Sequence, residues 1–193
     1  MKVIAFNGSA RKDGNTAILI DTVLNQMKKE GIETEVFNLR GKKIRGCIAC
    51  GKCFENQNRR CAVTGDVLNR CLEKMDEADG IIIGSPTYFT DVSAETKALI
   101  DRAGFVAKAN DDMFKRKAGA AVVAVRRAGA LHVFSTINNF FLISQMIVPG
   151  SSYWNLGIGL EKGDVEEDEE VIQTMKVLGE NMAWLMKKIQ TRS

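Results

Sequence analysis

The chain has 193 residues, of which 45% are hydrophobic and 26% charged, and its formal net charge is +3. This composition fits one globular domain with a sizeable core and excludes a disordered, collagenous or low-complexity chain. The net charge is too small to indicate a nucleic-acid or membrane-surface partner. We therefore expect a single domain over residues 1–193 that binds neither nucleic acid nor membrane.

The N-terminal residues turn polar after a short apolar run, without the apolar core or cleavage pattern of a secretory signal. No stretch reaches the ~20 apolar residues that a membrane span needs. We therefore expect a cytoplasmic protein, in which the five cysteines stay reduced.

Short apolar runs alternate with amphipathic stretches along the chain. We expect strands at residues 2–7, 32–39, 80–84, 118–125 and 147–148. We expect helices ending at Gly31, starting near Asp66, and covering residues 90–107, 131–146 and 171–189. Strands that alternate with amphipathic helices predict an α/β fold, a doubly wound parallel sheet with helices on both faces. For five strands, the flavodoxin-like order 2-1-3-4-5 is the leading candidate.

In such a sheet, ligands bind beyond the carboxyl ends of the strands, so the loops after strands one, three and four should carry the chemistry. A further candidate is the cysteine-rich loop at about residues 40–63, a long connection with little periodicity. Long irregular loops in compact domains are commonly functional.

The loop after the first strand contains the polar side chains Ser9, Arg11, Asn15 and Thr16. Its glycines match neither G-x-G-x-x-G nor the P-loop spacing. Hydroxyl, amide and backbone N–H donors at a helix N-terminus suit a terminal monophosphate, and Arg11 adds positive charge. The alternative is a plain turn in which Asn15 or Thr16 caps the helix.

Four segments resemble one family, and three of them correspond to its flavin loops. The pattern Ser9-x-Arg11-x-x-Gly14-Asn15-Thr16 resembles the phosphate loop of the flavodoxin-like NAD(P)H-dependent FMN reductases, and residues 85–89, 93–102 and 125–130 continue the resemblance. It implies that FMN is bound by Ser9, Arg11, Asn15, Thr16, Pro86, Thr87, Tyr88, Phe89 and Gly129.

The second flavin loop also fits this role from its residue types. Pro86 fixes the backbone, Thr87 offers a hydroxyl, and Tyr88 and Phe89 give aromatic surface for a flat ring. The alternative is a buried aromatic pair in a turn.

Four of the five cysteines form the pattern Cys47-x2-Cys50-x2-Cys53-x7-Cys61. Thiolates at this spacing can surround one centre and supply the four ligands of a [4Fe-4S] cluster. Zinc sites more often contain two separated C-x2-C pairs, a redox pair leaves two cysteines unexplained, and a loop without metal is a further alternative. The motif resembles that of the iron-sulfur flavoproteins, a branch of the same family. We expect Cys71, on the apolar face of the next helix, to be a packing residue.

Charge is distributed unevenly along the chain. Residues 40–60 carry seven basic side chains and one acidic side chain, which would stabilise thiolates and attract an acidic redox partner such as ferredoxin. The alternative is a solvated surface loop. Residues 128–160 contain no Lys, Arg, Asp or Glu, and the dense aromatic residues of 140–155 within them predict core packing together with a subunit interface. The family resemblance implies a homo-oligomer, a dimer or a tetramer.

These observations predict an FMN-dependent oxidoreductase that transfers electrons between a [4Fe-4S] cluster and FMN, with ferredoxin or NAD(P)H as external donor. No side chain is assigned as catalytic, because the chemistry belongs to the cofactors. The alternatives are an NAD(P)H-dependent FMN or quinone reductase without a cluster, and a zinc-stabilised binding module without turnover. His132, the only histidine, has no partners for a hydrolytic triad, and we expect it to be structural.

Overall fold

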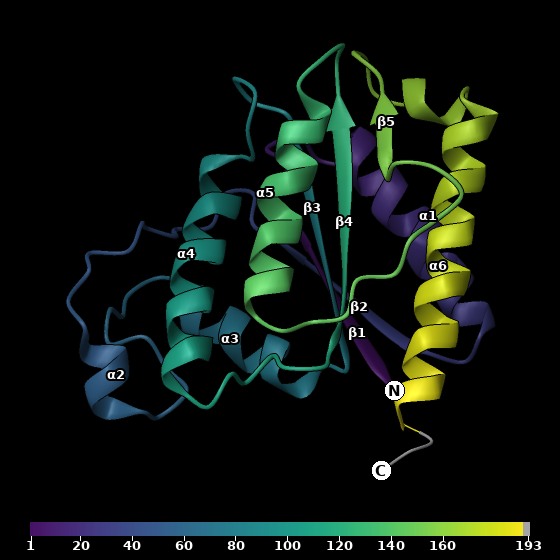
Figure 1. Ribbon diagram of the computed structural model, residues 1–193. Helices are drawn as coiled ribbons and strands as arrows, with labels where there is room; N and C mark the ends of the chain where they lie inside the picture. The colour runs from purple at the N-terminus through teal and green to yellow at the C-terminus, as the bar shows by residue number, and fades with distance from the viewer. Residues whose placement is uncertain (191–193) are drawn as a thin grey trace.

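One parallel sheet organises the molecule (Figure 1). The computed structural model describes residues 1–190, and within them five strands are arranged in the order β2-β1-β3-β4-β5. The strands are β1 (Lys2–Asn7), β2 (Glu33–Asn38), β3 (Gly80–Pro86), β4 (Ala118–Val125) and β5 (Leu156–Ile158). The predicted flavodoxin-like order is therefore confirmed.

Helices cover both faces of this sheet (Figure 1). One face carries α1 (Asn15–Lys29) and α6 (Glu169–Gln190), and the other carries α3 (Leu68–Glu77), α4 (Ala94–Ala109) and α5 (Ala130–Ile143). A short helix, α2 (Lys52–Asn56), lies outside α4, and a 3-10 helix, η1 (Asp164–Glu166), precedes α6. No helix within residues 1–190 is long and apolar enough to cross a membrane.

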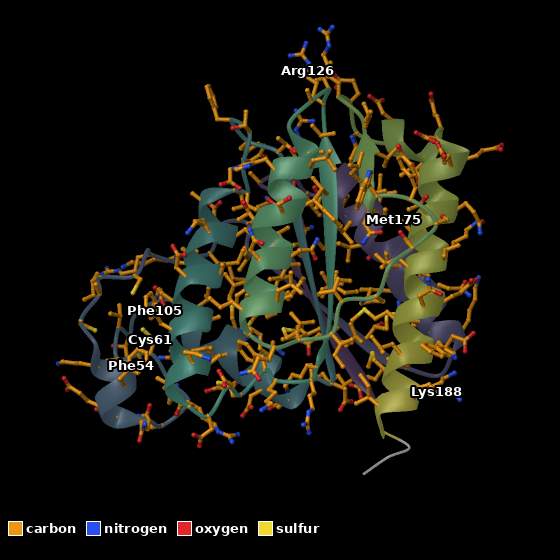
Figure 2. The ribbon with its side chains drawn as sticks, viewed as in Figure 1. Phe54, Cys61, Phe105, Arg126, Met175 and Lys188 are labelled. Atoms are coloured by element: carbon orange, nitrogen blue, oxygen red, sulfur yellow. The ribbon has the colours of Figure 1, made fainter. Side chains whose placement is uncertain are left out.

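All strands point the same way, so their carboxyl ends share one edge of the sheet. Arg126, the first residue after β4, marks this edge at the top of Figure 2. Lys188, near the end of α6, lies at the opposite end of the molecule. Loops at the upper edge are therefore the ones that a doubly wound sheet uses for ligands.

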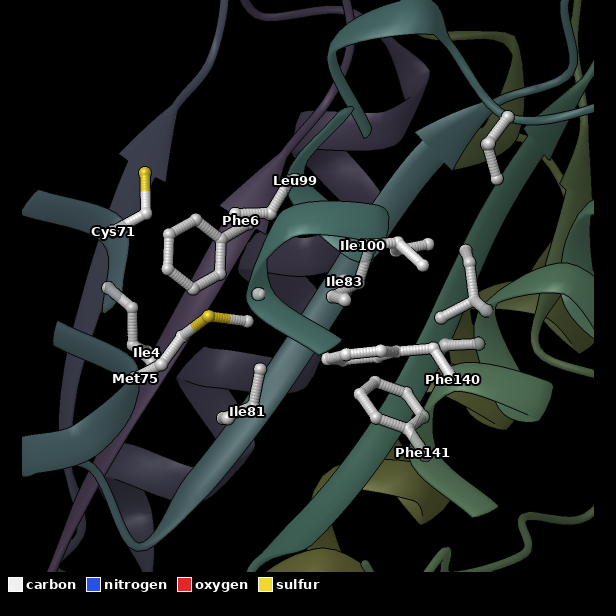
Figure 3. Close-up of a cluster of buried hydrophobic side chains, with 14 of the residues drawn as sticks. Ile4, Phe6, Cys71, Met75, Ile81, Ile83, Leu99, Ile100, Phe140 and Phe141 are labelled. Carbon is white, nitrogen blue, oxygen red and sulfur yellow. The ribbon is translucent and has the colours of Figure 1, made fainter. Parts of the chain in front are cut away.

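The core between the sheet and α3, α4 and α5 is built by alternate strand residues (Figure 3). Side chains two positions apart on a strand point to the same face, as Ile4 and Phe6 of β1 do. Fully buried partners from both the strands and the helices are Ile81, Ile83, Cys71, Met75, Leu99 and Phe141. The prediction that Cys71 is a packing residue agrees with its complete burial.

The predicted position of the last strand was wrong. Ile147 makes only an isolated bridge to Ala118, at the amino end of β4, whereas β5 pairs with residues 123–125 at its carboxyl end. Pro149 follows directly and has no N–H to continue a ladder. Residues 149–155 therefore form a connection without strand structure, after which the chain pairs with β4 again as β5.

Candidate functional site

The loops after β1, β3 and β4 pack against one another at the carboxyl edge. The N–H of Gly8 donates to the carbonyl of Gly84 at 2.8 Å, and a Cβ on Gly8 would lie 1.9 Å from Oγ1 of Thr96 in α4. Gly129 has a φ of +89°, and a Cβ there would lie 3.4 Å from Cγ2 of Thr87. Glycine is therefore needed at both positions, one for close approach and one for backbone conformation.

The loop after β1 leads into α1 without a side-chain cap. Gly14 is the N-cap residue, and no side chain in the described part of the chain accepts a hydrogen bond from the first turn. The alternative in which Asn15 or Thr16 caps the helix is thus not observed. Ser9 and Thr16 are buried, and Oγ of Ser9 accepts the N–H of Arg11 at 3.2 Å. This helix start offers backbone donors to an anion.

Arg11 and Asn15 hold a second loop, which the sequence did not predict. Nη1 of Arg11 donates to the carbonyl of Leu160 at 2.7 Å. The Asn15 amide donates to the carbonyl of Glu161 at 2.9 Å and accepts the N–H of Gly163 at 2.9 Å. These two side chains therefore connect the expected phosphate loop to the segment after β5.

The loop after β3 contains a tight turn. Tyr88 and Asp91 exchange two backbone hydrogen bonds of 2.9 and 3.2 Å, and Phe89 and Thr90 between them have φ values of 45° and 71°. Such a turn usually carries Asn and Gly, so this backbone is strained. Phe89 is fully exposed and Tyr88 is 43% exposed. The alternative of a buried aromatic pair is therefore wrong.

Thr87, just before this turn, has an unsatisfied polar atom. Its N–H donates to the carbonyl of Ala124 at 2.8 Å, which fixes the residue after Pro86 to the end of β4. Its Oγ1 is buried and has no hydrogen-bond partner among residues 1–190. Because an unpaired buried hydroxyl is costly, this atom fits a polar group of a bound ligand. The residues at this edge therefore fit a flavin.

The cysteine-rich segment forms a second site along α4. Figure 2 shows Cys61 beside Phe54 and Phe105, far from Arg126 at the carboxyl edge of the sheet. The rings of Phe54 in α2 and Phe105 in α4 meet edge to face, with centroids 6.5 Å apart. Together with Ile48, Val106 and Arg102, these two rings surround a cavity of about 140 Å³ that is also lined by Cys47, Cys50, Cys53 and Cys61.

These four thiols are free, and they share one cavity. Sγ of Cys47 accepts the N–H of Ala49 at 3.4 Å, and burial raises the pKa of the Cys53 thiol. Within residues 1–190, no group of three or more His, Cys, Asp or Glu side chains is arranged to hold a metal ion. The donor set, four free thiols on one cavity, has the chemistry of a four-thiolate centre, but in this structure the four sulfurs are not arranged around one point.

Asn69 fixes the backbone of Cys61. Its Oδ1 accepts the N–H of Cys61 at 2.8 Å, and its Nδ2 donates to the carbonyl of Cys61 at 3.0 Å. Asn69 is buried in the first turn of α3, so it connects the fourth cysteine to the helical layer.

Arg102 is the second anchor of this segment. Its guanidinium donates to Asp66, to the carbonyls of Arg45 and Val63 at 3.0 Å each, and to Sγ of Cys61 at 3.4 Å. The Arg102 and Asp66 side chains are each only 1% exposed. The buried ion pair is thus hydrogen-bonded on several sides, as a buried charge requires.

The pKa of Arg102 is raised and the pKa of Asp66 is lowered relative to their ordinary values. Burial alone would lower the pKa of Arg102, but its hydrogen bonds to Asp66 and Cys61 raise the pKa overall. Burial alone would raise the pKa of Asp66, but hydrogen bonds from Arg102 and backbone N–H groups lower it. Both groups therefore stay charged.

Neither Asn69 nor Arg102 was predicted from the sequence as a functional residue. A signal for Arg102 existed, because it follows Leu99 by three residues and precedes Val106 by four, on the buried face of α4. Two of the basic side chains that were expected to provide positive charge instead pair with α3, Arg59 with Asp76 at 2.9 Å and Arg60 with Glu73.

The sheet order and the converging loops define a flavodoxin-like protein, and comparisons with solved structures agree. The structure of RosB with a bound 8-demethyl-8-formylriboflavin-5'-phosphate intermediate matches with a TM-score of 0.75 and 23% identity, covering 99% of this chain and 81% of that one. A flavodoxin from the domain Archaea matches with a TM-score of 0.62 and 20% identity, covering 97% and 99% of the two chains.

Sequence comparisons are more specific. The model of the NADPH-dependent FMN reductase family matches residues 1–161. An iron-sulfur flavoprotein of Methanocaldococcus jannaschii is 40% identical over 202 residues, covering 98% of this chain and 100% of that protein. One of Methanosarcina thermophila is 31% identical over 192 residues, covering 98% and 97%. The chain belongs to the NADPH-dependent FMN reductase family, in its iron-sulfur flavoprotein branch, and is an FMN redox protein.

Proposed function

We propose that the chain binds both FMN and a [4Fe-4S] cluster and transfers electrons between them. The observation that carries this proposal is that four free thiols line one cavity while a separate edge of the sheet has the features of a flavin site. When bound, the cluster supplies one-electron steps and FMN supplies one- or two-electron steps. The proposed cluster ligands are Cys47, Cys50, Cys53 and Cys61.

The proposed FMN site uses the three loops at the carboxyl edge. Around the phosphate we place the start of α1 with Ser9, Arg11, Asn15 and Thr16, where uncapped backbone donors favour an anion. The ring site comprises Pro86, Thr87, Tyr88, Phe89 and Gly129. There, Oγ1 of Thr87 gains the hydrogen-bond partner that it lacks within residues 1–190, and exposed aromatic surface shields the ring from water.

The proposed cluster site is shielded by aromatic side chains. Phe54 and Phe105 form one wall of the cavity and would exclude water from a bound centre. Arg102 contributes a buried positive charge beside Cys61, which offsets the negative charge of thiolate ligands. The chain's own part in the reaction is thus to hold, shield and electrostatically tune its cofactors.

We further propose that the cluster of one copy serves the FMN of a second copy in a homo-oligomer. Ser93, at the flavin edge, caps the start of α4, whereas Phe105 at the cysteine cavity lies twelve residues further, or about 18 Å along the helix. The segment of residues 128–160, which contains no Lys, Arg, Asp or Glu, exposes Leu142, Ile143 and Trp154, and exposed apolar side chains suit a contact between subunits.

Anaerobic purification followed by measurement of FMN, iron, acid-labile sulfide and zinc tests the main proposal. We expect FMN together with about four iron and four sulfide per chain. Zinc without flavin would instead indicate the binding module. Reduction of the protein by ferredoxin and by NAD(P)H, compared in the same preparation, identifies the external donor.

The second candidate is an NAD(P)H-dependent FMN or quinone reductase without a cluster. It is favoured by the description of the matching family, which names NADPH and FMN. FMN without iron or sulfide after anaerobic purification, together with NAD(P)H oxidation, would support it over the first proposal.

A substitution within the uncharged segment of residues 128–160 tests electron transfer between subunits. Ile143→Glu, at a side chain that is 72% exposed, should dissociate the oligomer and slow electron transfer between the cofactors while both remain bound. Light scattering and the rate of flavin reduction measure these effects. Val36→Glu on the β2 edge is the control and should change neither. A cofactor-loaded monomer with an unchanged transfer rate would contradict the proposal.

A further inference from the structure

The cysteine segment, residues 45–63, begins and ends at one buried side chain. That side chain is Arg102, which contacts the backbone at both ends of the segment. Arg102 donates to the carbonyl of Arg45, two residues before Cys47, and to the carbonyl of Val63, two residues after Cys61. All four cysteines of the cavity lie between these two carbonyls. One guanidinium from α4 therefore holds together the two ends of the segment that contains every proposed ligand.

Arg102 is also exceptional in its burial. It is the largest fully buried side chain of the part of the chain that the structure describes. Its hydrogen bonds use both terminal nitrogens, with Nη1 toward Asp66 and Arg45 and Nη2 toward Val63 and Cys61. A buried side chain of this size with a full charge costs desolvation free energy, so packing alone does not explain an arginine here.

The contact with Cys61 faces the cavity. Nη2 lies 3.4 Å from Sγ of Cys61, and Arg102 itself lines the cavity with the four cysteines. Asp66 binds the opposite nitrogen, so the positive side of the ion pair is directed toward the sulfur. A guanidinium remains protonated across the whole physiological pH range, which makes this a fixed charge.

We propose that Arg102 is a positioning residue with two roles: it closes the base of the cysteine segment, and it makes the bound cluster easier to reduce. The second role rests on the proposed cluster function. Hydrogen bonds to ligand sulfurs and nearby positive charge stabilise the more negative, reduced state of a cluster, and they act strongly where water is excluded. The first role needs only the geometry of the chain.

The test must remove the guanidinium without leaving Asp66 buried and unpaired. Asp66→Asn is therefore the reference, and the double variant Asp66→Asn with Arg102→Gln differs from it only in the guanidinium. We expect the double variant to have a more negative cluster midpoint potential than Asp66→Asn, measured by spectroscopically monitored redox titration. Arg59→Gln removes a charge from the same segment at a side chain that is 63% exposed, and its shift should be smaller.

Trypsin digestion of the iron-free protein tests the first role, because the segment contains Lys52, Arg59 and Arg60. We expect cleavage there to be about tenfold faster in the double variant than in Asp66→Asn, since the base of the segment opens more often. Arg102→Lys separates the roles and guards against misfolding of the double variant. It keeps the charge but not the planar fork, so it should speed cleavage while shifting the potential less than the double variant does.

The two roles can be overturned separately. A double variant with the potential of Asp66→Asn, or with a shift no larger than that of Arg59→Gln, would overturn the tuning role. Equal cleavage rates in the double variant and in Asp66→Asn would overturn the first role, closure of the base of the segment. If the wild-type protein contains no iron and sulfide, the proposed function fails and the tuning role fails with it, and the digestion of the iron-free chain still decides whether Arg102 closes the segment.

Discussion

The carboxyl edge of the sheet and the cysteine segment are held in different ways. At the edge, backbone hydrogen bonds and close packing fix the loops after β1, β3 and β4, as between Gly8 and Gly84, and side chains add the segment after β5. The cysteine segment is instead fixed by the side chains of Asn69 and Arg102, while Cys47 and Cys50 are exposed. The fold itself thus forms the first site, whereas the second depends on a few side chains and on what its thiols bind.

The largest effect that separates the two regions should come from Cys50→Ser. We expect loss of all cluster iron and sulfide with FMN content unchanged, because the cysteine cavity shares no lining residue with the flavin loops. Metal analysis and flavin absorbance measure both quantities. Cys71→Ala, which replaces the buried packing cysteine, is the matched control and should keep both cofactors. Full iron content in the serine variant would refute the ligand assignment.

Asn69→Ala should destabilise the base of the cysteine segment. The substitution leaves the N–H and the carbonyl of Cys61 without their side-chain partner, so we expect the free energy of unfolding to fall by about 2 kcal/mol. Urea denaturation of the iron-free protein measures it. Asn56→Ala, at an exposed position in the same segment, is the control and should cost less than about 0.5 kcal/mol. Equal losses in the two variants would show that Asn69 is not an anchor.

At the flavin edge, Thr87→Val should act on FMN alone. Valine cannot offer the hydroxyl that has no partner within residues 1–190, so we expect FMN to bind about fivefold more weakly, with iron content unchanged. Flavin fluorescence during titration of the flavin-free protein gives the Kd. Thr64→Val, at an exposed position in the cysteine segment, should leave the Kd as in the wild type. Unaltered binding by Thr87→Val would remove this hydroxyl from the proposed site.

The smallest expected effect is a loss of stability on replacing Cys71, which belongs to neither site. Burial raises the pKa of its thiol to about 12 from a reference of 9.0. Because the folded state binds this proton more tightly, its contribution to stability is complete below pH 9 and is lost as the pH rises toward 12. Cys71→Ala should therefore lower the free energy of unfolding by about 1 kcal/mol at pH 7, with a smaller difference from wild type above pH 9. Denaturation at pH 7 and pH 10 compares them, and a constant difference would contradict the burial effect.

The sheet was predictable because its pattern is local. Apolar runs such as residues 80–84 and 118–125 predict buried strands, and their alternation with helices favours a parallel, doubly wound sheet. The last strand was not predictable from pattern, because β5 is only three residues long and its pairing depends on where the chain returns to β4 after Pro149.

The candidate sites were predictable to a similar degree. The spacing of the cysteines identified the residues that line the cavity, since adjacent ligands must lie close in the chain. The anchors Asn69 and Arg102 come from α3 and α4, and their role follows from tertiary contacts that no spacing encodes. For the same reason, the bonds of Arg11 and Asn15 to residues 160–163 were not foreseen.

Helix α4 contributes residues to both sites, and the angle between these residues around the helix axis is set by the number of residues that separates them. Thr96 abuts Gly8 at the flavin edge, and Arg102, less than two turns later, enters the base of the cysteine segment. Insertion of one residue between them would rotate Arg102 by about 100° and advance it by about 1.5 Å, away from Arg45 and Val63. The six-residue interval between Thr96 and Arg102 therefore sets how the flavin edge and the base of the cysteine segment are oriented relative to each other, and a change in its length would uncouple them.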